Sequence, residues 1–138
     1  MKDIKGTRTE ENLKRALTIE AEAVMRYNSF ARRANIEGFN DVAMLFSSSA
    51  AGECGHALGH LEFLRKDPVS GNAMNRTRLN IQSAIASETA EYHEMYPRMA
   101  EIAREEGFEE IAIWFETLSK AERSHATQFQ KALNTLLD

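Results

Sequence analysis

The two halves of this chain repeat one another at an offset of 69 residues. The segment Glu37-Gly38-Phe39 returns as Glu106-Gly107-Phe108. Further matches at the same offset are Tyr27 with Tyr96, Val42 with Ile111, Ala43 with Ala112, Phe46 with Phe115, Glu53 with Glu122, and His56 with His125. Self-similarity at a fixed period indicates a duplicated structural unit. We therefore expect both halves to adopt the same fold.

Breaker residues are too scarce for a fold with many strands. The 138 residues include only 7 Gly and 2 Pro, and strands need turns that such residues supply. Apolar residues recur at helical spacing, which predicts four helices at about residues 7–37, 40–65, 76–106 and 109–136, with a kink at Pro97. Thr7 and Glu10 form a capping box for the first helix. The sequence thus predicts an all-α, single-domain four-helix bundle over residues 1–138, made of two duplicated pairs, 7–65 and 76–137, joined by a linker at 66–75.

Charge and composition argue against several classes of partner. The 17 Lys and Arg residues against 21 Asp and Glu give a net charge of −4, which offers no electrostatic reason to bind nucleic acid. No apolar run approaches the roughly 18 residues of a membrane span, and the start of the chain lacks an apolar signal segment. We therefore expect a cytoplasmic protein. Cys54 is the only cysteine, so a disulfide framework is excluded.

Each predicted apolar stripe is interrupted near its middle by a carboxylate. The four are Glu20, Glu53, Glu88 and Glu122, and Glu91 lies beside the third stripe. Buried carboxylates are costly unless a partner compensates their charge, and no stripe carries a basic residue at this level. Metal cations are the remaining solution. Histidine among the carboxylates suits iron, manganese or zinc, whereas magnesium and calcium favour oxygen ligands alone.

The spacing of the candidate ligands is more specific than their number. Glu53-x-x-His56 and Glu122-x-x-His125 place each Glu and His on one helical face. Glu20 and Glu88 lie 33 and 34 positions upstream of these pairs. Two Glu-x-x-His pairs with one Glu from each of two other helices are the ligand pattern of ferritin-like dimetal carboxylate proteins.

The chain resembles the rubrerythrin family, from Lys2 to the fourth predicted helix. The most specific segments are residues 88–97, Glu-Thr-Ala-Glu-Tyr-His-Glu-Met-Tyr-Pro, and 103–108, Ala-Arg-Glu-Glu-Gly-Phe. The resemblance implies a ferritin-like di-iron domain. Its implied ligands are Glu20, Glu53, His56, Glu88, Glu91, Glu122 and His125. In the family, the residues corresponding to Glu91 and His56 exchange as ligands of one iron when the redox state changes. Tyr27 and Tyr96 would lie near the site.

The same resemblance implies an activity, that of a non-haem di-iron peroxidase that reduces hydrogen peroxide to water in oxidative-stress protection. The usual rubredoxin domain, which needs four Cys, has no counterpart here, as in the short, sulerythrin-like branch of the family. Electrons would then come from an external donor, such as a separate rubredoxin. The alternative is a ferritin-like iron-binding or storage protein with ferroxidase activity. The extra ligand Glu91 favours the peroxidase.

The linker is short for a bundle formed by one chain. The second helix would be ~39 Å long at ~1.5 Å per residue, and ten extended residues reach only ~33–36 Å. We therefore expect a domain-swapped homodimer. His60 follows His56 by one turn, and we expect it to be a helix-end residue near solvent and not a ligand.

Overall fold

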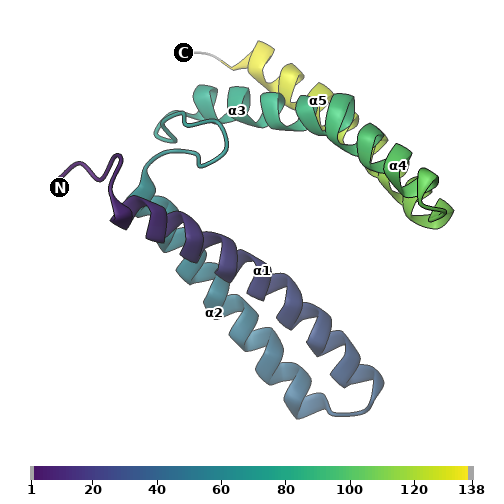
Figure 1. Ribbon diagram of the computed structural model, residues 1–138. Helices are drawn as coiled ribbons and strands as arrows, with labels where there is room; N and C mark the ends of the chain where they lie inside the picture. The colour runs from purple at the N-terminus through teal and green to yellow at the C-terminus, as the bar shows by residue number, and fades with distance from the viewer. Residues whose placement is uncertain (1, 137–138) are drawn as a thin grey trace. The chain divides into compact units, whose positions relative to one another are not determined.

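The computed structural model describes residues 2–136, which are arranged as two helical hairpins (Figure 1). In the first unit, which extends to Lys66, α1 (Arg8–Ile36) packs against α2 (Asn40–Leu64). In the second, which begins at Asp67, the run α3 (Thr77–Ala90), η1 (Glu91–Met95) and α4 (Tyr96–Glu105) packs against α5 (Glu109–Thr135). The all-α prediction is confirmed for the described residues. Residue 137, where the second predicted pair ends, lies outside them.

The ends of the helices follow local sequence signals. The Thr7 Oγ1 atom accepts a hydrogen bond from the Glu10 backbone N–H at 3.2 Å, which caps α1 as predicted. Gly38 and Gly107 end the first long helix of each hairpin with φ values of 86° and 88°. These left-handed conformations are free of strain only for glycine. The duplicated Glu-Gly-Phe segment is therefore the turn that closes each hairpin.

Small side chains line the seam between the paired helices. In α2 the buried residues Ala43, Ala50, Ala57 and Leu64 recur every seven residues, and buried Ala23, Ala31 and Ala34 face them from α1. Ala112 and Ala126 repeat the pattern in α5, against Ala100 and Ala103 of α4. A seam of alanines lets two helix backbones approach closely, but it removes little apolar surface from water.

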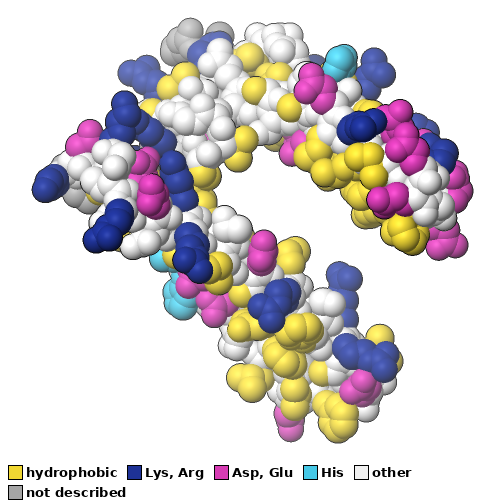
Figure 2. Space-filling view, viewed as in Figure 1, with side chains coloured by type: hydrophobic (Ala, Val, Ile, Leu, Met, Phe, Trp, Pro, Cys, Tyr) yellow, Lys and Arg dark blue, Asp and Glu magenta, His cyan; other side chains and the backbone are white. Residues whose placement is uncertain are grey.

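Most large apolar side chains consequently remain outside these seams. Among the described residues, Leu45 is 66% exposed, Phe63 56% and Trp114 57%. Figure 2 shows hydrophobic side chains over the surface of both hairpins. Contiguous exposed apolar surface of this kind marks an interaction site. Each hairpin therefore presents an apolar face that a partner helix pair would cover.

The third predicted helix contains a π-helical segment that the sequence analysis did not predict. The predicted kink at Pro97 is replaced by η1, in which the Tyr96 N–H donates to the Glu91 carbonyl five residues earlier. Pro97 has no N–H to donate, and the carbonyl of Tyr92 instead accepts from Ser119 Oγ of α5 at 2.9 Å. The π-helical turn and a side chain from the facing helix thus accommodate the proline.

The π-helical segment adds one residue to the second copy of the duplicated unit. Before it, equivalent residues are 68 positions apart, as in Leu17 with Ile85 and Glu20 with Glu88. After it the offset is 69, as in Tyr27 with Tyr96. A π bulge holds one extra residue within an otherwise α-helical run. The segment Glu91–Met95 is therefore an insertion relative to α1, and it begins at the candidate ligand Glu91.

Candidate metal centre

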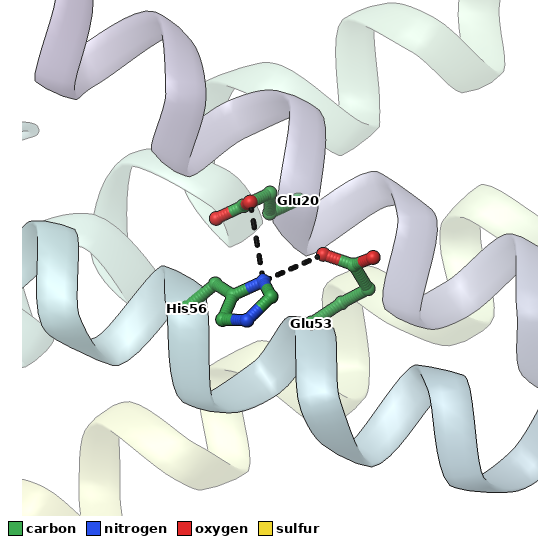
Figure 3. A group of neighbouring side chains, drawn as sticks. All are labelled: Glu20, Glu53 and His56. Carbon is green, nitrogen blue, oxygen red and sulfur yellow. Dashed lines mark hydrogen bonds and ion pairs between the residues drawn. The ribbon is translucent and has the colours of Figure 1, made fainter.

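Three of the predicted ligands meet inside the first hairpin, with Glu20 on α1 and both Glu53 and His56 on α2 (Figure 3). The His56 Nδ1 atom lies 3.1 Å from Glu53 Oε2 and 3.4 Å from Glu20 Oε1. One ligand atom from each residue lies within 4.8 Å of the other two. This triad can therefore offer two carboxylates and one imidazole to a single ion.

The second hairpin contains the equivalent triad, Glu88 on α3 with Glu122 and His125 on α5. The His125 Nδ1 atom lies 3.0 Å from Glu122 Oε2 and 3.6 Å from Glu88 Oε2. Its ligand atoms again lie within 4.8 Å of one another. The duplication thus produces the same donor set twice, once in each hairpin.

Glu91 lies close enough to the second triad to interact with it electrostatically. Burial, followed by the charge of Glu122, raises the pKa of Glu91. Burial and the charges of Glu91, Glu122 and Glu88 likewise raise the pKa of Tyr96. Its phenol packs against the ring of Phe115, with ring centroids 5.9 Å apart. Tyr27 packs in the first hairpin against Phe30 and Phe46.

The donor set fits a transition-metal ion. Glu20 Oε2 and Glu88 Oε2 are buried and have no hydrogen-bond partner, which is costly for carboxylate oxygens. Burial and a hydrogen bond with Glu122 raise the pKa of Glu88 to about 7, because two acidic groups share one site. A cation placed among these oxygens would remove both penalties. Carboxylates combined with imidazole match iron, manganese or zinc.

The raised pKa of Glu88 predicts how the stability of the metal-free protein depends on pH. A carboxyl group with a folded-state pKa near 7 and an ordinary value of 4.5 stabilises the fold fully below pH 4.5, and this contribution is lost as pH rises through 7. We expect the free energy of unfolding to fall by about 2 kcal/mol between pH 5 and pH 8, at about 1.4 kcal/mol per pKa unit. Urea titrations of the metal-free protein measure it. The variant E88Q should lose most of this dependence, while E94Q, at an exposed position, should keep it.

The structure also brings His60 to the site, where the sequence analysis did not place it. Its Nε2 atom lies 2.7 Å from Glu20 Oε2, and the imidazole is only 26% exposed. The expectation of a solvent-facing helix end was therefore wrong. Its position one turn after His56 was a usable signal, since residues four apart share a helix face.

Comparisons with known proteins agree with this site. The rubrerythrin family model matches residues 11–133. A rubrerythrin from Nitratidesulfovibrio vulgaris is 38% identical over 94% of this chain and 71% of its own length. A rubrerythrin from Clostridium perfringens is 35% identical over 95% of this chain and 72% of its own. A solved structure of nigerythrin in a mixed-valence state is 30% identical, with a TM-score of 0.44, and covers 91% of this chain and 66% of its own.

Proposed function

Because this chain belongs to the rubrerythrin family of ferritin-like di-iron proteins, we propose that it is a non-haem di-iron peroxidase acting in oxidative-stress protection. Its substrate would be hydrogen peroxide, reduced to two waters with electrons from an external donor such as a separate rubredoxin. The observation that carries the proposal is the pair of equivalent Glu, Glu, His triads, one in each hairpin, with Glu91 beside the second.

Seven side chains would hold two iron ions, and manganese or zinc suits the same donors. They are the two triads and Glu91, that is, Glu20, Glu53, His56, Glu88, Glu91, Glu122 and His125. Two ferrous ions supply the two electrons that cleavage of the peroxide O–O bond requires. The five carboxylates would balance most of the charge of the oxidised and the reduced ion pair.

The remaining polar groups can position the substrate and its protons. The raised pKa of Tyr96 keeps its phenol protonated at neutral pH, so Tyr96 Oη can donate a hydrogen bond to a peroxide oxygen. Tyr27 occupies the equivalent position in the first hairpin. We propose that the two phenols flank the peroxide, while exchange between Glu91 and His56 adjusts the charge around one iron.

Stopped-flow oxidation of the ferrous protein tests the activity. The protein is loaded with iron in the absence of oxygen and mixed with hydrogen peroxide or with oxygen at equal concentration. A peroxidase should be oxidised at two irons per peroxide, and much more slowly by oxygen. Faster oxidation by oxygen, with growth of a ferric mineral, would support the ferroxidase and storage alternative and contradict the proposal.

We further propose that the active form is a domain-swapped homodimer. The 25 residues of α2 span about 37 Å, a distance that the linker reaches only when nearly extended. Part of the linker is folded, since the Asp67 N–H donates to the Asn72 carbonyl and the Gly71 N–H to the Asp67 carbonyl, both at 2.8 Å. The exposed apolar face of each hairpin needs a cover that a second chain would supply.

The mass of the metal-loaded protein in solution checks the assembly. We expect light scattering to give about twice the 15.6 kDa of one chain, at concentrations where both ions are bound. A monomer that still binds two ions would contradict the swap and leave the proposed activity standing.

A further inference from the structure

The two halves of the candidate centre differ at one position of the duplicated helices. His60 in α2 is equivalent by the offset of 69 residues to Phe129 in α5. Glu20 therefore has an imidazole beside it, whereas an apolar ring occupies the corresponding position on the helix that faces Glu88. Otherwise the triads match residue for residue, so this substitution is a source of asymmetry that the duplication itself does not provide.

The Glu20 carboxylate lies between two histidines one helical turn apart. Its Oε1 atom is 3.4 Å from His56 Nδ1, and its Oε2 atom is 2.7 Å from His60 Nε2. His60 does not belong to the group of ligand atoms that lie within 4.8 Å of one another, which contains Glu20, Glu53 and His56. His60 is thus placed to act on Glu20 and not to bind the same ion.

The contact between His60 and Glu20 joins two buried polar atoms. Neither His60 Nε2 nor Glu20 Oε2 has a hydrogen-bond partner, although they are only 2.7 Å apart. An unsatisfied buried polar atom costs about 1–3 kcal/mol, so a small rotation of the imidazole that lets Nε2–H donate to Oε2 is favoured. This hydrogen bond would occupy Oε2 and leave Oε1 for the metal.

We propose that His60 is a positioning residue that fixes Glu20 as a ligand through one oxygen and makes the two metal positions unequal. Glu88 Oε2 is buried without a partner, so both oxygens of Glu88 remain available to the other ion. Neighbours that hydrogen-bond to metal ligands typically change metal affinity about 10–100-fold. The proposal rests on the proposed di-metal site but not on its reaction with peroxide.

Cobalt binding to the full-length metal-free protein tests this role without any turnover. Titration of the wild type with Co²⁺ should show two binding steps per site. The variant H60F, which installs the residue of the second half, should keep two ions but weaken one step about 10-fold and change its visible absorption. The variant H60Q, which retains an N–H donor at similar reach, should recover affinity to within about threefold of the wild type.

The alternative outcomes separate the two proposals. Equal Co²⁺ affinity in H60F and the wild type would refute the role of His60, and so would complete loss of one ion in H60F, which would make His60 a ligand. Failure of H60Q to recover the affinity of a folded variant, as judged by circular dichroism, would also refute it. A wild type that binds two Co²⁺ but, when loaded with iron, ignores peroxide would refute only the proposed activity. A wild type that binds no Co²⁺ would overturn both.

Discussion

Replacing Glu122 with alanine should remove at least one of the two bound ions. Glu122 is hydrogen-bonded to His125 and to Glu88, so its loss disrupts every contact within the second triad. Loss of a group that merely orients a ligand weakens metal binding about 10–100-fold, and loss of a ligand itself should cost at least about 100-fold. Titration of the metal-free protein with Fe²⁺ or Zn²⁺ against a coloured chelator measures both the number of ions and their affinity.

The matched control for this substitution is E116A. Glu116 lies on the same helix, but its carboxylate pairs with Arg104 at 3.0 Å, away from the triad. The exposed pair should contribute less than about 1 kcal/mol to stability, and E116A should bind two ions as the wild type does. If E122A also bound two ions with unchanged affinity, the second triad would not be a metal site.

Replacing Glu91 with alanine should separate metal binding from peroxide chemistry. The six residues of the two triads remain in this variant, so we expect two ions to bind with affinity lowered by less than about tenfold. The rate of oxidation by peroxide should fall at least about tenfold, because the ligand that would exchange with His56 is gone. Anaerobic iron titration followed by stopped-flow mixing with peroxide measures the two quantities on one sample.

The variant E94A serves as the comparison, since Glu94 belongs to the same π-helical segment but is exposed. It should retain both iron binding and peroxide kinetics. Unchanged kinetics in E91A would remove the main reason for preferring a peroxidase to a ferroxidase. Equal slowing in E91A and E94A would attribute the effect to the π-helical segment itself and not to the Glu91 carboxylate.

The features that sequence predicted are those that depend on residues close together in the chain. The Glu53 and His56 pair shares a face because helical geometry brings residues three apart together, and the same holds for Glu122 and His125. The Glu-Gly-Phe turns are local for the same reason, since a left-handed glycine ends the helix. The 69-residue offset then extended each local inference to the other half. Together these signals predicted the hairpins and the triads.

Two features depended on atoms brought together from different helices. The π-helical segment could be suspected from the spacing between each helix's central Glu and the following Glu-x-x-His pair, 33 residues in the first half and 34 in the second. Spacing alone does not place the extra residue, because a loop would also absorb it. Its position is decided where Ser119 of α5 satisfies the Tyr92 carbonyl that Pro97 leaves without a donor.

The sequence by itself determined the two helical hairpins and the donor set of each triad, because periodicity, turn residues and ligand spacing are local properties of a helix. Only the tertiary structure decided that His60 faces Glu20 and that Glu91 opens a π-helical turn beside the second triad. Both depend on the separation and rotation of neighbouring helices. The close alanine seams set that separation, and the sequence pattern of a single helix does not encode it.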